Sequence, residues 1–228
     1  MAVIRFLIYI LVLVAIFYLI MNFLFGGVKG LTTLQSGDTT QVIDGSTLPA
    51  SLSNNYGIST WFFVSDWSTK YGQNKTVFTM GGNDNPSIVL GGTNNDILVN
   101  VECYVDGSTQ THQCVVQNFP LQKWVNCIVS LYGRSLDIYI DGKLVRTCVL
   151  PGTATIPNTK TITVTPDKGF SGYTSNIRYY PDAISPQDAY NIYKEGFGAS
   201  SWLSNLLNKY RLKIAFLKDN TEEASFEI

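Results

Sequence analysis

The sequence predicts an all-β fold: a two-sheet antiparallel β-sandwich, with a transmembrane helix before it and a further helix after it. Three observations predict the sandwich. Short β-branched and aromatic segments recur at regular spacing, clusters of Asn, Asp and Gly separate them, and helical patterns appear only near the two ends. Since parallel strands need long, usually helical crossovers, this order favours an antiparallel sandwich or jelly roll.

The strongest signal lies in residues 124–150, which predict three strands joined by two tight turns. Asp141-Gly142 lies between apolar alternations and suits a two-residue type I′ turn, in which both residues have φ > 0. A second turn is predicted at Gly133-Arg134. The two registers agree on one apolar face, and a slip by one residue would turn that face to solvent. The face comprises Val125, Cys127, Val129, Leu131, Leu136, Ile138, Ile140 and Val145.

The other strands follow in order along the chain. They are predicted over residues 56–65, 75–80, 87–90, 97–105, 110–117, 161–165 and 173–180. A short helix follows them, because Ser185 is a suitable N-cap, Pro186 fits the first helical position and Gly196 is a suitable C′ residue. In the C-terminal extension, the apolar residues from Trp202 to Leu217 have helical spacing, which predicts an amphipathic helix before the acidic tail.

The N-terminal segment from Val3 to Phe25 is almost wholly apolar, with Arg5 as its only charged residue. As a helix it would be ~34 Å long, enough to cross a ~30 Å hydrocarbon core. A cleaved signal peptide would have a shorter apolar region and a small-residue cleavage site, which residues 28–30 do not supply. We therefore predict a single-pass membrane anchor.

These signals divide the chain into four parts. Residues 1–27 are the anchor, residues 28–50 form a neck leading to an edge strand, residues 51–198 form the sandwich, and residues 199–228 form the amphipathic helix with its acidic tail. The net charge of −1 gives no long-range attraction to nucleic acid. We expect partners among lipid bilayers, other structural protein subunits and glycans instead.

The predicted strand registers also indicate which of the four cysteines can form a disulfide bond. Centring the hairpin of residues 97–117 at Ser108-Thr109 sets Cys103 opposite Cys114, a position that permits a cross-strand disulfide. Cys127 and Cys148 fall on opposite faces of their predicted strands and should stay reduced. Two free buried thiols would favour assembly in a reducing compartment.

Several motifs resemble those of a known family. The Trp that opens residues 124–150 and the strand ending in Asp141-Gly142 resemble laminin-G-like domains of the concanavalin A-like lectin/glucanase superfamily. Residues 57–64 resemble the opening core strand of these domains. The segment before Gly196 resembles their closing motif, through Gly172, Ile177, Arg178, Tyr180, Ile184 and Ser185. The resemblance implies a concanavalin A-like jelly roll.

The resemblance also raises the question of hydrolysis, because some relatives are glycoside hydrolases that need two carboxylates a few ångströms apart. The strand motif of that branch, E-x-D-x-x-E, is absent. Asp137 is better explained as the cross-strand partner of Arg146, and the sandwich's glutamates, Glu102 and Glu195, lie in unrelated elements. The single histidine, His112, has no nucleophile motif nearby. We predict no catalytic residue, no enzymatic activity and no resident cofactor.

Calcium and sugar binding stay open. Two turns flank the predicted strand at residues 87–90, and their side-chain oxygens are of the kind that Ca²⁺ binds, although tight turns require the same residue types and this simpler explanation is favoured. The turn residues are Asn83, Asp84, Asn85, Asn94, Asn95 and Asp96. Aromatic side chains could provide a sugar-stacking surface, although core packing explains most of them in a sandwich. The candidates are Trp67, Tyr71, Tyr104, Tyr179 and Tyr180.

The sequence thus predicts a membrane-anchored protein that binds or builds, without turning over a substrate. In a first hypothesis it is a structural protein that links an internal membrane to a protein shell, since anchored sandwiches of this kind are similar to minor capsid proteins in the virions of large DNA viruses. In a second hypothesis it is an anchored adhesion module that binds glycans through its rim loops. Strong, calcium-dependent glycan binding would favour the second hypothesis, and its absence the first.

Overall fold

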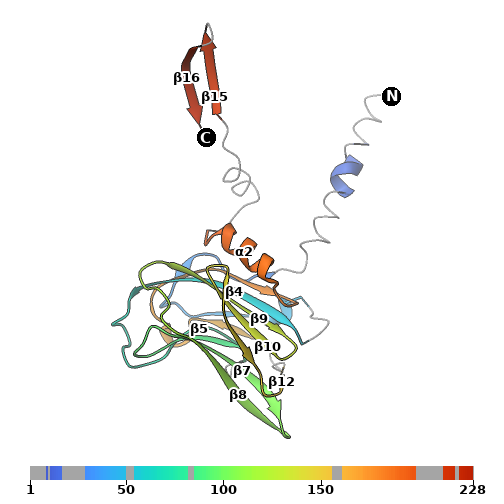
Figure 1. Ribbon diagram of the computed structural model, residues 1–228, viewed down its shortest axis with the longest axis vertical. Helices are drawn as coiled ribbons and strands as arrows, with labels where there is room; N and C mark the ends of the chain where they lie inside the picture. The colour runs from blue at the N-terminus through green and yellow to red at the C-terminus, as the bar shows by residue number, and fades with distance from the viewer. Residues whose placement is uncertain are drawn as a thin grey trace.

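The computed structural model describes residues 9, 11–16, 29–49, 54–81, 85–155, 161–198, 213–218 and 221–227. Within these residues the chain forms two seven-stranded antiparallel sheets packed face to face, with helix α2 (Pro186–Glu195) over one of them and a separate two-stranded hairpin near the C-terminus (Figure 1). The predicted all-β sandwich is therefore confirmed.

The first sheet has the order β1-β14-β4-β9-β10-β11, with β2 also paired to β14, and the second has the order β12-β7-β6-β5-β13-β3, with β8 also paired to β7. The first sheet consists of β1 (Lys29–Gly30), β2 (Gln35–Ser36), β4 (Tyr56–Asp66), β9 (Trp124–Tyr132), β10 (Ser135–Ile140), β11 (Lys143–Val149) and β14 (Ser171–Tyr180). The second consists of β3 (Gln41–Ile43), β5 (Lys75–Met80), β6 (Ser87–Leu90), β7 (Ile97–Val105), β8 (Ser108–Val116), β12 (Thr153–Ala154) and β13 (Ile162–Val164). Two short 3₁₀ turns are η1 (Gly45–Thr47) and η2 (Pro166–Lys168).

The core lies between the sheets, where the inward-facing side chains of both are buried. Its large, fully buried members include Phe62, Phe78, Ile88, Leu131, Leu136 and Phe170. A second, smaller cluster lies under α2 on the outer side of the first sheet, where Ile128 and Tyr139 pack against Ala189 and Ile192. Strand β9 is therefore buried on both faces, which explains why its sequence is apolar almost throughout.

Helix α2 begins and ends where the sequence predicts. The Ser185 hydroxyl accepts a hydrogen bond from the Asp188 backbone N–H at 3.2 Å, which satisfies one of the free amides of the first turn. Pro186 occupies the first turn, where the missing N–H costs nothing. Gly196 follows the last turn with φ = +80°, a conformation that favours glycine.

The β9–β10 register is confirmed, and the β10–β11 register is confirmed only near its turn. Asp141 and Gly142 have φ of +51° and +73°, as a type I′ turn requires. A β-bulge at Val145 then shifts the ladder, so Val145 is 47% exposed and leaves the predicted apolar face. The same shift corrects the predicted Asp137–Arg146 pair: Asp137 lies opposite Thr147, whose hydroxyl donates to its carboxylate at 2.7 Å.

The bulge also explains why the cysteine prediction is wrong. In an unbulged ladder Cys148 would lie opposite Ser135, on the outer face, but the shifted ladder sets it opposite Leu136, toward the core. There it forms a disulfide with Cys114 of β8, with a Cα–Cα distance of 6.2 Å, so the bond joins the two sheets. Two thiols remain free and buried, Cys103 and the correctly predicted Cys127.

The predicted Cys103–Cys114 bond fails because the hairpin turns earlier than expected. Asp106 and Gly107, with φ of +48° and +84°, form a two-residue turn, so Cys103 lies opposite Gln110 and Cys114 opposite Val99. Asp106-Gly107 therefore fits the same preference of Asp-Gly for two-residue hairpin turns that predicted the turn at Asp141-Gly142.

The N-terminal prediction is tested in part. Most of the segment from Val3 to Phe25 lies outside the described residues, and within the part of the chain that the structure describes no helix is long and apolar enough to cross a bilayer. The segment predicted as a neck instead contributes strands: Lys29 pairs with Tyr179 in β14, and β3 is the predicted edge strand. The anchor itself stays a prediction.

The C-terminal helix prediction is wrong for its last residues. Strand β15 (Lys213–Lys218) pairs with β16 (Thr221–Glu227) in a hairpin, whereas the earlier part of the predicted helix, residues 202–212, lies outside the described residues. Ile214 and Phe216 also fit the period-two alternation of a strand, so the apolar pattern of this short segment is compatible with either a helix or a strand. Asp219-Asn220, residue types that favour turns, separate the two strands.

Candidate functional site

One concavity of the sandwich, which we call the polar groove because many of its lining side chains carry hydroxyl or charged groups, has a volume of about 450 Å³. It lies where the start of β14 and the end of β4 meet the segment that follows β2. Hydroxyl groups, one carboxylate, two ammonium groups and an exposed aromatic ring line it. The lining residues are Ser36, Asp38, Ser65, Thr69, Lys70, Lys168, Phe170, Ser171, Gly172 and Tyr173.

Backbone pairing holds these residues in place. The Gly37 N–H donates to the Gly172 carbonyl at 2.8 Å, and the Phe170 N–H donates to the Gly37 carbonyl at 3.1 Å, so the segment after β2 is fixed to the start of β14. The Ser65 and Ser171 hydroxyls, on the adjacent strands β4 and β14, are hydrogen-bonded at 3.0 Å. A Cβ atom at Gly172 would collide with the Phe63 carbonyl, so only glycine allows β4 and β14 to approach this closely.

The two lysines of the polar groove, and Asp167 next to one of them, lie on strained backbone. Lys70, Asp167 and Lys168 have φ of +53°, +53° and +58°, values that side-chain-bearing residues rarely adopt. The Lys70 ammonium donates to the Asp167 backbone carbonyl and so fixes the two loops to each other. Strained backbone of this kind persists where surrounding structure enforces it, and it clusters at binding sites.

Asp38 is the acceptor of the polar groove. Hydrogen bonds from the Ser36 and Thr39 hydroxyls lower the pKa of its carboxyl group, and the Lys168 charge adds to the effect. The carboxylate is therefore ionised at neutral pH. Tyr173 is 48% exposed beside it, whereas Phe170 is buried. An anionic acceptor, two cationic donors, several hydroxyls and a ring face together can hydrogen-bond and stack on a polyhydroxylated ligand.

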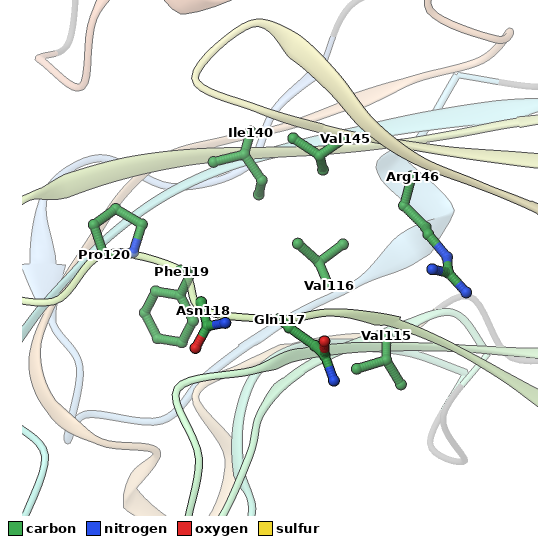
Figure 2. A pocket seen from close by; sticks show the side chains of 9 residues that line it. All are labelled: Val115, Val116, Gln117, Asn118, Phe119, Pro120, Ile140, Val145 and Arg146. Carbon is green, nitrogen blue, oxygen red and sulfur yellow. The ribbon is translucent and has the colours of Figure 1, made fainter.

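A second concavity, which we call the edge groove, has different chemistry. It measures about 390 Å³ and lies between the end of β8 and the β10–β11 hairpin, beside the Cys114–Cys148 bond that ties these strands together. Figure 2 shows Ile140 and Val145 on one wall and Val116 and Phe119 on the other, with Arg146 to one side. Its full lining is Val115, Val116, Gln117, Asn118, Phe119, Pro120, Ile140, Val145 and Arg146. Six apolar side chains together with two amides and one guanidinium group suit a peptide segment, which carries apolar side chains and backbone polar groups, better than a sugar.

The residues predicted for calcium do not converge. Asn85 is buried, and its amide donates to the Thr155 hydroxyl at 2.7 Å, while the Asn95 amide donates to the Phe119 carbonyl at 2.7 Å. These groups brace loops at opposite ends of the four-residue strand β6, about 13 Å apart. Asn83 and Asp84 lie outside the described residues. Among the residues that are described, no three His, Cys, Asp or Glu side chains gather in a way that could hold a metal ion.

The side-chain contacts of the remaining members of that set point the same way. The Asp96 carboxylate accepts from the Asn118 N–H at 3.2 Å and so braces the loop after β8. Asn94 lies in the same turn, where its backbone carbonyl accepts from the Asp96 N–H at 2.8 Å. These roles match the favoured explanation of the turn residues, which is that they build turns.

The aromatic residues predicted to stack on sugars are scattered. Tyr179 is only 7% exposed, and Trp67 packs edge-on against Phe119 at 5.8 Å between ring centroids. Tyr71 and Tyr104 are well exposed, but Tyr104 lies on β7 of the second sheet and Tyr71 in the loop after β4. Tyr180, half-buried, ends β14. The exposed ring of the polar groove, Tyr173, was not among the candidates.

The carboxylates considered for hydrolysis are held by other partners. Glu195 forms an ion pair with Arg178, and the Glu102 carboxylate accepts from the Thr155 hydroxyl at 3.4 Å. Asp141 forms an ion pair with Lys123 at 3.0 Å. His112 is half-buried on β8, opposite Val101.

Comparisons with known proteins agree with this architecture. The receptor binding domain of botulinum neurotoxin C/D mosaic serotype superposes with a TM-score of 0.56 at 15% identity, over 73% of this chain and 44% of that one. The ligand binding domain of botulinum neurotoxin serotype D in complex with N-acetylneuraminic acid gives a TM-score of 0.52 at 13% identity, over 72% and 46%. The chain therefore spans less than half of these domains, and at such identities the likeness shows the fold alone. None of the curated proteins compared with the chain matches it.

A family model supplies the assignment that the sequence motifs suggested. The model is described as the concanavalin A-like lectin/glucanases superfamily, and it matches residues 35–189, which is more than half of the chain and covers both sheets except β1, together with the start of α2. The chain belongs to the concanavalin A-like lectin/glucanase superfamily.

Proposed function

We propose that this protein is a non-catalytic, membrane-anchored lectin-like module that binds glycans through the polar groove. The observation that carries the proposal is the polar groove itself, where Asp38, Lys70, Lys168 and the exposed ring of Tyr173 line one concavity. Sugars present both hydroxyl groups and an apolar ring face, and this combination of side chains complements both.

Binding is favoured over hydrolysis by the composition of the groove. Glycoside hydrolases place two carboxyl groups about 5 to 9.5 Å apart, one of them with a raised pKa so that it can act as the acid. Within the described lining of the polar groove Asp38 is the one carboxylate, and its pKa is lowered. A single ionised acid can accept hydrogen bonds from a sugar but cannot supply both catalytic roles.

The comparison structures support the proposal without deciding it. One of the two neurotoxin domains is described as a ligand binding domain in complex with N-acetylneuraminic acid, and the other is described as a receptor binding domain. These are binding modules of the same fold. The membrane part of the proposal depends on the apolar segment from Val3 to Phe25, whose length suits a bilayer-spanning helix.

A structural role is the second candidate, in which the sandwich links an internal membrane to a protein shell as a minor capsid protein. The observation that favours it is the outer edge of the first sheet. Strand β11 has no further strand beyond it in the described sheet, and Leu144, Val145 and Val149 on it are 51%, 47% and 70% exposed. An exposed apolar edge strand is a surface on which another protein can add a strand.

A glycan array decides between the two candidates. The full chain, held in lipid nanodiscs, should bind a defined subset of glycans, and Asp38→Asn should weaken the binding by about tenfold because it removes a charged acceptor. Asp106→Asn, at an exposed turn on the second sheet, is the matched control and should bind as the parent does. Absence of binding to every glycan would overturn the lectin proposal and favour the structural role.

A further inference from the structure

A ladder of stacked aromatic rings runs across the outer side of the first sheet. Phe197, just beyond α2, stacks on Trp124 of β9 with centroids 4.4 Å apart and also contacts Trp61 of β4 at 6.0 Å. Tyr193 stacks on Trp61 at 5.7 Å, and Phe63 contacts Trp124 at 5.8 Å. We call these five residues the aromatic ladder.

The aromatic ladder is only partly covered by protein. Phe197 is 41% exposed, and Trp124, Phe63 and Tyr193 are half-buried. Tyr190, on the outer side of α2, is 47% exposed and has the Lys194 ammonium 5.5 Å from its ring centroid. Amphipathic aromatic rings flanked by a lysine are the residue types that concentrate at the level of lipid headgroups.

The segment that carries Phe197 is fixed to the sheet. The Ser175 hydroxyl donates to the Phe197 carbonyl at 2.5 Å, the Asn176 amide donates to the Gly196 carbonyl at 3.1 Å, and Arg178 forms an ion pair with Glu195. All three anchoring side chains belong to β14. The chain therefore leaves the sandwich toward its C-terminal extension directly beside β14, on the side of the ladder.

The N-terminal connection reaches the same strand. Lys29 and Gly30 of β1 pair with Tyr179 and Arg178 of β14. The apolar segment that ends at Phe25 is four residues before Lys29, and four residues span at most about 14 Å. If the apolar segment crosses a bilayer, β14 is held within about that distance of the bilayer surface.

We infer that the aromatic ladder and the exposed side of α2 rest on the bilayer that the N-terminal segment spans. The inference rests on the membrane anchor of the proposed function and adds the orientation of the domain. A short tether fixes β14 next to the lipid, and the face beside β14 carries the partly exposed rings. The β7–β8 hairpin, at the end of the sandwich opposite α2, points away from the bilayer (Figure 1).

Site-specific fluorescence in nanodiscs tests the orientation. The full chain would carry a fluorophore on Tyr190→Cys, or on Tyr104→Cys as the matched control, since both tyrosines are exposed and Tyr104 lies on β7. The native free thiols, Cys103 and Cys127, are buried and should not react. Lipids with a nitroxide near the headgroup should quench most of the fluorescence at position 190 and little at position 104.

Each outcome is decisive. Equal quenching at the two positions would overturn the inference. A label at position 190 that is shielded from aqueous iodide but not quenched by the nitroxide lipid would also overturn it, because a protein partner would then cover this face. A chain that does not enter nanodiscs at all would show that the anchor is wrong and would remove the basis of the inference. Quenching at position 190 alone supports both.

Discussion

The environment of a single residue can differ from what its sequence context predicts, and Lys75 is the clearest case in this sandwich. It opens β5, is 1% exposed, and its ammonium has no hydrogen-bond partner among the described residues. The ammonium lies 4.2 Å from the centroid of the Trp67 ring. Burial lowers the pKa of Lys75, and the nearby Lys70 charge adds to the effect. A desolvated cation–π contact contributes about 2 kcal/mol, whereas burying an unpaired ion costs several.

We therefore expect Lys75→Met to stabilise the domain by about 1 to 3 kcal/mol at neutral pH. The parent's folded state binds fewer protons than its unfolded state between the lowered pKa and the ordinary value of 10.5, so its stability should rise with pH across that interval. Urea unfolding at several pH values would measure both effects. A destabilised variant, or a variant that keeps the same rise with pH, would contradict the explanation.

The residues of the polar groove show why sites are harder to read from sequence than folds. The sequence predicts a neck around Asp38 and a strand around Tyr173, and no spacing connects positions so far apart in the chain. Ser36 and Ser171 are residue types common in any β protein. The pairing of β2 with β14 brings these residues together. That pairing consists of only two residue pairs, so it leaves no periodic pattern in the sequence. Gly37, Gly169 and Gly172 make close backbone contacts beside the groove, but the sequence does not reveal what each glycine contacts.

At the scale of elements, the regular hairpins and the helix were predictable, and the irregular ones were not. The β9–β10 register, the β10–β11 turn and the ends of α2 follow from local rules for turns and caps that Gly133, Asp141-Gly142 and Ser185 satisfy. No such local rule predicts the bulge at Val145, because a bulged valine cannot be distinguished in the sequence from a regularly paired valine. That single shift moved Cys148 to the core side and determined which cysteines are bonded.

The inter-sheet disulfide should contribute strongly to stability. It closes a sequence separation of 34 residues between β8 and β11, and the chain-entropy model gives about 4 kcal/mol for a loop of this length. A reductant should therefore lower the free energy of unfolding of the parent by about 3 to 4 kcal/mol and leave a Cys114→Ser, Cys148→Ser double variant unchanged. Equal stability of the parent with and without reductant would show that these strands do not depend on the bond.

The cap of α2 offers a second, smaller test. Ser185→Ala removes the hydroxyl that accepts from the Asp188 N–H, and should cost about 1 kcal/mol. Ser185→Asp keeps an acceptor at the N-cap and should cost much less. Thermal unfolding of the two variants side by side would measure the difference. If Ala and Asp are equally destabilising, the cap does not hold the helix.

At the scale of the whole molecule, both ends of the sandwich are fastened to one strand. β1 enters beside Tyr179, and the chain leaves through Phe197, which Ser175 holds in place. The polar groove lies at the other end of β14, around Ser171 and Tyr173, about 20 Å from Tyr179 along the strand. Tyr173 lies directly opposite Phe63 of the aromatic ladder, so a protein anchored in this way would hold the groove beside the ladder and close to the bilayer.

Photo-crosslinking is the most direct test of the claim that the polar groove binds sugar. A glycan that binds on the array would be synthesised with a diazirine group, crosslinked to the full chain in nanodiscs, and located by peptide mass spectrometry. We predict crosslinks in residues 36–38 and 168–173, with loss of the crosslinks in Tyr173→Ala and their retention in Tyr132→Ala, a control that is 69% exposed. Crosslinks confined to residues 115–120 of the edge groove, or spread evenly over the surface, would contradict the claim.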